Sequence, residues 1–151
     1  MVLTNSKPTV YLAGPVQAKD DGGSSWRNTV KHQFSDGYEF RDPLDKYNVP
    51  VEDLTVVGTE TDDPNAVSVG EIVEGDKDLL QQSDAVLVGY DCVRSIGTPM
   101  EVMWAYERDY PIAVWIRDET PVIDMSPWYR YHADVLVPEV VTALENLEVR
   151  L

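Results

Sequence analysis

Glu101 and Asp76 are the two residues of this sequence whose type and position could carry out chemistry. Glu101 lies in the first turn of a helix predicted at 98–109, after an apolar strand predicted at 85–90. In open parallel sheets, ligands bind beside the carboxyl ends of strands and the helix N-termini next to them, so Glu101 would face a binding crevice. An alternative is a capping box, in which Thr98 is the N-cap, Pro99 follows it and Glu101 bonds back to the backbone.

Asp76 interrupts the apolar stripe of a helix predicted from about residue 67. The same stripe carries Ile72, Val73, Leu79, Leu80 and Ser83. An unpaired carboxylate on such a face loses hydration, which raises its pKa toward the range that a general acid needs. Gly75 beside it suits the close approach of another group. The alternative is that Asp76 pairs with an arginine or meets solvent at the helix end.

Two carboxylates in one cleft, one ionised as a nucleophile and one acting as an acid, are what glycosyl transfer with retention requires. Tyr11 lies in a strand predicted at 9–13 and could donate a hydrogen bond that orients the nucleophile. Its alternative is a partly buried strand tyrosine without a role in chemistry.

The sequence has no pattern typical of a metal or cofactor site. His32 and His132 are isolated, and there is no His-Glu-x-x-His pair or cysteine cluster. Gly22-Gly23 matches neither a dinucleotide-binding fingerprint nor a phosphate-binding loop that ends in Gly-Lys-Ser/Thr. We therefore expect no metal and no cofactor.

Length and composition indicate one domain over residues 1–151. A chain of this size buries about 70% of the surface that its unfolded form exposes, so it needs no metal or disulfide to fold. Cys92 is the single cysteine, which agrees with a reducing, cytoplasmic location or with a small apolar position behind a strand. No stretch approaches the roughly 20 apolar residues of a membrane span, and residues 1–8 do not resemble a signal peptide.

Strands alternate with helices along the chain. We predict strands at 9–13, 38–41, 85–90, 111–116 and 134–137. We also predict a helix with Ser24 or Ser25 as its N-cap, and helices that begin at about 67, at 98, at 126 (one turn) and at 138. This alternation predicts an α/β fold with a mostly parallel five-stranded sheet and helices on both faces. Residues 43–64 are acidic, contain three prolines and show no sustained period, so we predict a long loop or lid.

Four sequence blocks together resemble the nucleoside 2-deoxyribosyltransferase family, including its nucleotide N-glycosidase relatives. The blocks are Tyr11-Leu-Ala-Gly-Pro15 followed by Ser25-Trp-Arg27, Asp76-Lys-Asp-Leu-Leu-Gln-Gln-Ser-Asp84, Ser95-Ile-Gly-Thr-Pro-Met-Glu101, and Ser126-Pro-Trp128. They cover nearly the whole chain. The resemblance implies a flavodoxin-like or Rossmann-like three-layer fold.

The resemblance also implies roles for single residues. Glu101 matches the nucleophile that attacks the anomeric carbon, Asp76 the aspartate that assists the leaving base, and Tyr11 the tyrosine that positions the nucleophile. The expected substrate-binding residues are Gly14, Pro15, Arg27, Asp91, Ser95, Gly97 and Ser126. In the family a neighbouring subunit completes the pocket, here through Ser126, so we expect a homodimer or larger assembly with a shared active site.

Ser95 bears on substrate choice. Family members that act on free nucleosides tend to carry an acidic residue six positions before the nucleophile, whereas a serine resembles the enzymes that accept 5′-monophosphates, because a hydroxyl can donate to phosphate. Pro15 and Gln17 depart from the serine and arginine that some of those enzymes carry. Arg27 or Arg94 would supply the missing charge, unless each is a surface ion-pair residue.

Two functions follow as hypotheses. The first is an enzyme of nucleotide metabolism or salvage, a transferase or hydrolase, that cleaves or exchanges the N-glycosidic bond of 2′-deoxynucleosides or their 5′-monophosphates through an intermediate on Glu101. The second is a non-catalytic nucleotide-binding or sensing domain of the same fold. A purely structural role would leave Asp76 on its apolar stripe unexplained.

Acidic residues outnumber basic ones 27 to 12, which gives a formal net charge of −15. Such a charge disfavours a nucleic acid polymer as a partner, although a small anion can still bind through local arginines. The excess is spread along the chain, as in proteins suited to concentrated salt, so a halophilic source is a hypothesis.

We expect the stability of the protein to rise from dilute buffer to molar salt, because ions screen the repulsion between its excess carboxylates. Thermal unfolding followed by circular dichroism over a series of potassium chloride concentrations measures this. A midpoint that is highest in dilute buffer would contradict the halophilic hypothesis.

Overall fold

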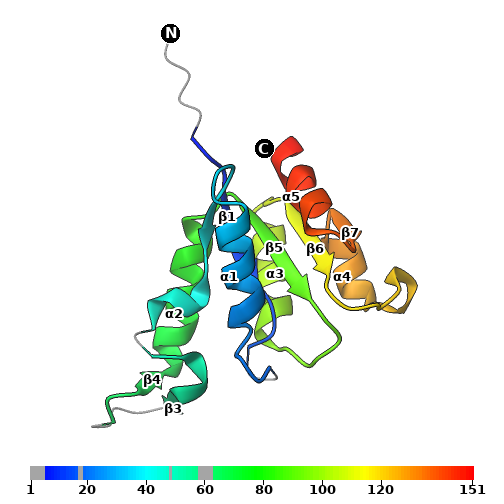
Figure 1. Cartoon of the computed structure of the whole chain (residues 1–151). Helices are drawn as coiled ribbons and strands as arrows, with labels where there is room; N and C mark the ends of the chain where they lie inside the picture. Colours follow the sequence, from blue (N-terminus) through cyan, green and yellow to red (C-terminus); the bar gives the residue numbers. More distant parts are fainter. Residues whose placement is uncertain (1–5, 17–18, 48, 58–62) are drawn as a thin grey trace.

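A five-stranded, fully parallel sheet forms the centre of the computed structural model, which describes residues 6–16, 19–47, 49–57 and 63–151. Its strands are β1 (Thr9–Ala13), β2 (Glu39–Arg41), β5 (Ala85–Tyr90), β6 (Ile112–Ile116) and β7 (Val135–Val137), in the spatial order β2-β1-β5-β6-β7 (Figure 1). This is the strand order of flavodoxin-like folds, in which ligands bind where the winding reverses. That point lies between β1 and β5. The predicted α/β fold is confirmed.

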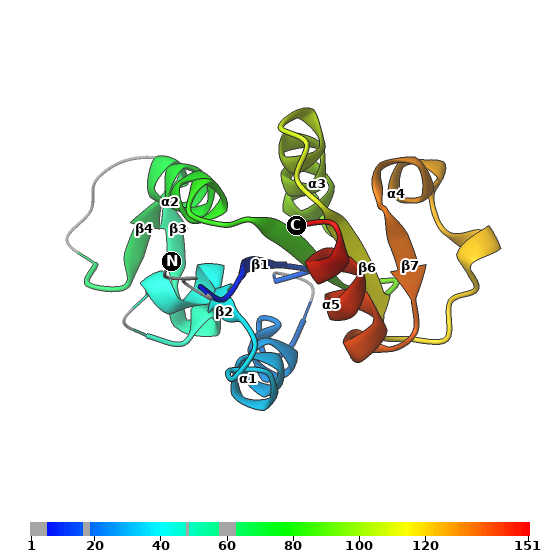
Figure 2. The same cartoon turned by 90° about the horizontal axis from the view of Figure 1, so that it is seen from above.

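Helices cover both faces of the sheet, which gives three layers (Figure 2). The helices α1 (Ser24–Gln33) and α5 (Val140–Val149) cover one face, and α2 (Val69–Gln81), α3 (Gly97–Glu107) and α4 (Pro127–His132) lie on the other. A 3-10 turn, η3 (Val122–Asp124), precedes α4. Strands enclosed in this way are buried on both sides: every residue of β1 and every residue of β5 except Tyr90 is buried.

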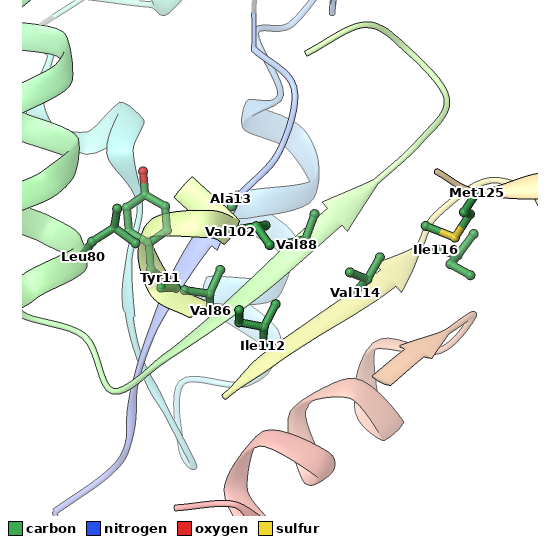
Figure 3. Close-up of a cluster of buried hydrophobic side chains, with 11 residues drawn as sticks. Tyr11, Ala13, Leu80, Val86, Val88, Val102, Ile112, Val114, Ile116 and Met125 are labelled. Atoms are coloured by element: carbon green, nitrogen blue, oxygen red, sulfur yellow. The ribbon is translucent and has the colours of Figure 1, made fainter. Parts of the chain in front are cut away.

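Alternate residues of β1 enter two different apolar clusters. Val10 and Leu12 pack toward α1 and α5, whereas Tyr11 and Ala13 pack toward α2 and α3. Figure 3 shows the Tyr11 ring beside Leu80, with its hydroxyl oxygen pointing away from the rest of the cluster. The sheet therefore holds the ring in the core and leaves the polar end at its edge.

Several helices begin at residues other than those predicted. The helix expected from about 67 begins at Val69, because residues 66–68 form a strand and Ser68 makes a capping box with Glu71. The N-cap of α1 is Gly23, in the left-handed conformation that glycine tolerates, rather than Ser24 or Ser25. The terminal helix begins at Val140, two residues after Pro138.

The segment predicted as a long loop contains secondary structure. It forms the 3-10 turns η1 (Pro43–Lys46) and η2 (Val51–Asp53) and the strand β3 (Thr55–Val57), which pairs in parallel with β4 (Ala66–Ser68). The prediction of an irregular loop was therefore wrong, because these short elements show no sustained sequence period. Residues 48 and 58–62 lie outside the described part of the chain.

Two further observations concern the class of protein. No helix in the described residues is long and apolar enough to cross a membrane. Cys92 is exposed in the loop after β5 and does not pack behind a strand.

Candidate active site

A pocket of about 840 Å³ opens at the carboxyl ends of β1 and β5, where the winding of the sheet reverses. Its polar wall includes Glu101 of α3, Asp76 of α2 and Lys46 at the end of η1. The lining also includes the apolar residues Leu44, Val51, Leu54, Val56, Val67 and Ile72. The segment predicted as a lid thus forms part of the pocket wall, and its closure over a ligand stays a prediction.

Glu101 bonds to Tyr11 and not to the start of its own helix. The Tyr11 hydroxyl donates a hydrogen bond to the Glu101 carboxylate. Because α3 begins at Gly97, with Ile96 as an N-cap that makes no side-chain bond, the alternative of a capping box between Thr98 and Glu101 is wrong. Thr98 instead lies buried inside the helix, and its hydroxyl contacts the Ser95 hydroxyl at 2.7 Å.

The electrostatic surroundings of Glu101 oppose its ionisation. Burial raises its pKa from 4.5 to about 8, and the negative charge of Asp76 adds to this rise. The hydrogen bond from Tyr11 and the positive charges of Arg27 and Lys46 act in the opposite direction. At neutral pH the site is therefore poised close to the proton exchange of this carboxyl group, as functional carboxyls often are.

Tyr11 is fully buried, and its hydroxyl stays protonated as a hydrogen-bond donor throughout the ordinary pH range. Burial, followed by the charges of Glu101 and Asp76, raises the pKa of its hydroxyl far above the usual value. The hydroxyl therefore keeps its proton and holds the carboxylate by a hydrogen bond, which is the contact that the sequence suggested for this residue.

Asp76 forms an ion pair with Lys46, so it is neither unpaired nor bound to an arginine. Burial raises the pKa of Asp76, as expected for a carboxylate on an apolar stripe, and the Lys46 ammonium opposes the rise. The predicted close approach to Gly75 is made by the same lysine: a Cβ on Gly75 would lie 3.0 Å from Lys46 Cδ. Lys46 was missed from the sequence because its segment has no periodicity that places it against α2.

Arg27 is buried inside the protein, so its assignment as a surface ion-pair residue was wrong. Its guanidinium donates to the backbone oxygens of Leu12, Gly23 and Gly14 at 3.3, 3.0 and 3.0 Å. Asp42 lies 3.8 Å from Nε. Burial lowers the pKa of Arg27, and the acidic groups around it oppose that change. Arg27 lines the pocket, but its N–H groups donate to backbone oxygens and so stabilise the loop after β1.

The structure brings only some of the remaining candidate residues to the pocket. The pocket lining includes Gly14, Ser95, Gly97 and Arg94, as predicted. It also includes Lys19, which was not predicted as a site residue. Pro15 is buried and outside the lining. Gln17 lies outside the described residues.

Asp91 and Ser126 are engaged in other contacts in this chain. Asp91 accepts hydrogen bonds from Lys19 at 2.8 Å and Arg117 at 3.4 Å, which ties together the loops after β1, β5 and β6. Ser126 is exposed, and its hydroxyl accepts from Trp128 N at 3.2 Å as the N-cap of α4. Neither lines the pocket, so their roles in binding stay predictions.

Among the described residues, no group of three or more His, Cys, Asp or Glu is placed to hold a metal ion. His32 is exposed on α1, whereas His132 is buried at the end of α4, where Nδ1 lies 2.7 Å from Trp128 O.

Comparisons with known proteins show similarity of fold. No protein-family model and no curated protein matches the sequence. Among solved structures, a conserved protein from Enterococcus faecalis V583 aligns over 97% of this chain and 100% of its own, with 15% identity and a TM-score of 0.67.

Two further solved structures of similar fold are those of an enzyme and of a cofactor-binding protein. A 2-deoxyribosyltransferase from the psychrotolerant bacterium Bacillus psychrosaccharolyticus aligns over 87% of this chain and 86% of its own, with 13% identity and a TM-score of 0.63. A molybdenum cofactor binding protein from Rippkaea orientalis covers 97% and 96%, with 17% identity and a TM-score of 0.55. The fold relationship to a 2-deoxyribosyltransferase agrees with the resemblance found in the sequence.

Replacing Glu101 by Gln should stabilise the protein at alkaline pH. The folded protein retains the Glu101 proton up to about pH 8, whereas the unfolded chain releases it near 4.5, so the wild type loses stability as the pH rises through this window. Gln cannot ionise and avoids this loss. The stability of Glu101→Gln relative to the wild type should grow by about 2–4 kcal/mol between pH 5 and pH 9.

Urea unfolding at a series of pH values measures the effect. Glu107→Gln is the matched control, because Glu107 is exposed on the same helix. A stability difference between Glu101→Gln and the wild type that is independent of pH would contradict the raised pKa.

Proposed function

We propose that this protein cleaves or exchanges the N-glycosidic bond of a 2′-deoxynucleoside or its 5′-monophosphate by double displacement. The observation that carries the proposal is that Glu101 and Asp76, from two different helices, line one pocket, while the buried Tyr11 of β1 donates a hydrogen bond to Glu101. Retaining glycosyl transfer needs a nucleophile and a second group that assists the leaving group. The shared fold with a 2-deoxyribosyltransferase supports this choice of chemistry.

In the proposed reaction, the ionised Glu101 carboxylate attacks C1′ while the bond to the base breaks. Tyr11 holds the carboxylate in position through its hydrogen bond. The Asp76–Lys46 pair faces the departing base. Water or a second base then attacks C1′ and releases Glu101, so hydrolysis and transfer differ only in the molecule that reaches the intermediate.

The pocket suits the two parts of such a substrate. Its polar wall, with Glu101 and the Ser95 hydroxyl, would take the sugar, and its mainly apolar part would take the flat base. Lys19 and Arg94 add positive charge at the pocket lining, which supports a 5′-monophosphate despite the acidic net charge of the chain.

A non-catalytic nucleotide-binding or sensing domain is the second candidate. The raised pKa of Glu101 favours it, because a carboxyl that stays protonated at neutral pH is a weak nucleophile. The cofactor-binding protein among the solved structures of similar fold is an example of a binder with this architecture. This candidate predicts binding of nucleotides without any product.

Incubation with 2′-deoxynucleosides and their monophosphates, with and without a second base, separates the two candidates. We expect a free or exchanged base, detected by chromatography, and a loss of at least about 1000-fold in Glu101→Ala because the nucleophile is gone. Glu107→Gln should retain wild-type activity. Release of no base from any substrate, or full activity in Glu101→Ala, would refute the mechanism, and nucleotide binding without turnover would favour the second candidate.

We also propose that the protein self-associates through an apolar patch on α3 and α4. The patch consists of Met103, Tyr106, Trp128 and Tyr131, and the last two are 68% and 71% exposed. Contiguous exposed aromatic residues are typical of protein interfaces. Ser126 lies at the start of the same helix α4, which supports its proposed contribution to a neighbouring pocket.

Replacing Trp128 by Glu should weaken the assembly, because a charge on the patch would lose its hydration at the interface. Light scattering coupled to size-exclusion chromatography measures the mass. Val149→Glu is the control, since Val149 is 85% exposed on α5, on the other face of the sheet. A monomeric wild type at micromolar concentration would contradict the proposal.

A further inference from the structure

Lys46 is a charged residue of the pocket lining without a chemical step of its own in the proposed reaction. Its ammonium pairs with the Asp76 carboxylate and lies 4.8 Å from the centre of the Tyr47 ring. Its side chain is 20% exposed and contributes to the pocket lining. Lys46 is therefore a mostly buried residue of the pocket lining that pairs with another lining residue.

The aliphatic part of Lys46 is held by packing against α2. A Cβ on Gly75 would lie 3.0 Å from Lys46 Cδ and 3.1 Å from Lys46 Cε, so the absence of a side chain at Gly75 makes room for the lysine. The next residue, Asp76, then receives the ammonium. Side-chain packing and the ion pair together fix the lysine at the place where the leaving base would lie.

The ion pair places hydrogen-bond donors beside Asp76. Burial raises the pKa of Asp76 and the Lys46 ammonium opposes this rise; in the pair, the Asp76 carboxylate accepts the hydrogen bond that Lys46 donates. The ammonium keeps three N–H donors, of which Asp76 takes one. When the bond from C1′ to the base breaks, its electron pair stays on the ring nitrogen, and the base needs a proton to leave as a neutral molecule.

Other donors at the pocket are engaged or unsuited. The Tyr11 hydroxyl donates to Glu101, and Arg27 donates to backbone oxygens. Lys19 pairs with Asp91, which does not line the pocket, whereas Lys46 pairs with Asp76, which does. Arginine does not release its proton in proteins, which also removes Arg94 as a source. Burial raises the pKa of Tyr47 and makes its hydroxyl a poorer acid.

We propose that Lys46, oriented by Asp76, donates the proton that the departing base takes up. This inference rests on the proposed function and gives the proton-donating step to a residue other than Asp76. In the step, a Glu101 oxygen bonds to C1′, the C1′–N bond breaks with its electron pair left on the base, and a proton passes from Lys46 Nζ to the base. The neutral amine then takes up the proton that the attacking water or second base loses when it bonds to C1′ and releases the Glu101 carboxylate.

The test compares an ordinary base with one that leaves without needing a proton. Guanine and 7-methylguanine form such a pair as their 2′-deoxynucleotides, and thymine with the more acidic 5-fluorouracil serves if only pyrimidines are turned over. For Lys46→Met we expect a loss of about 100- to 1000-fold in kcat on the ordinary base and less than about 10-fold on the other. Lys46→Arg keeps the charge but should show the same selective loss.

Each result decides between explanations. An equal loss on both bases would mean that Lys46 only shapes the pocket, and full activity of Lys46→Arg on the ordinary base would mean that charge alone is needed; either overturns the inference. Lys77→Met is the matched control, because Lys77 is exposed on α2 next to Asp76. A wild type without activity on any base would refute the proposed function, and the inference with it, whereas an active wild type with an unaffected Lys46→Met refutes the inference alone.

Gly75→Ala provides a second variant that leaves every ionisable group in place. Its Cβ would displace the Lys46 side chain, while alanine favours the helical conformation more than glycine does, so unfolding should not accompany the change. We expect a selective loss of about 10-fold on the ordinary base, in the direction seen for Lys46→Met. An unchanged ratio between the two bases would count against the placement of the proton donor by Gly75.

Discussion

The arrangement of the pocket depends on one constraint: burial opposes the negative charge that Glu101 bears when it is ionised. A carboxylate removed from water is stable only with donors and cations around it. The Tyr11 hydroxyl supplies the donor, and Arg27 and Lys46 supply the cations. Asp76 adds a second negative charge, so the site combines the carboxyl groups of Glu101 and Asp76 with the cationic side chains of Arg27 and Lys46. Each of the four groups therefore influences the protonation of the others, and none has an independent role.

The core of the protein fixes one half of this arrangement. Tyr11 stands on a strand that is enclosed on both faces, so its ring cannot move without disturbing the packing of the sheet. Arg27 binds three backbone oxygens around the loop after β1 and holds that loop to α1. A Cβ on Gly14 would lie 2.9 Å from Gly89 O, which shows how closely β1 and β5 approach at the pocket. The side of the site that would act on the sugar is thus part of the rigid fold.

The parts of the structure that the sequence predicted are those that depend on local patterns. Apolar strands alternating with helices predicted the sheet, and the position of Asp76 on an apolar stripe indicated a desolvated carboxylate. Local patterns also misled: the capping box expected at Thr98 and Glu101 is absent, because the Tyr11 hydroxyl, 90 residues away in sequence, takes the carboxylate.

Contacts between distant residues explain the remaining differences. Lys46 reaches Asp76 across 30 residues, from a segment whose short 3-10 turns and strands follow no period. Nothing in its immediate sequence distinguishes it from a surface lysine. Arg27 was expected to bind a phosphate or to lie at the surface, and its burial follows from backbone oxygens that the folded loop after β1 brings together. Gly75 alone gave a local sign of close approach, without indicating which residue approaches.

The two halves of the site differ in how they are attached to the fold. Glu101 and Tyr11 belong to the sheet and the helix packed on it, whereas Lys46 and much of the apolar wall come from residues 43–57, beside the two-stranded sheet. Under the proposed function, a change in those residues would alter contacts to the base without moving Glu101. The ion pair between Lys46 and Asp76 joins this segment to the carboxyl groups of the pocket, so chemistry at the sugar and selection of the base would depend on different parts of the chain.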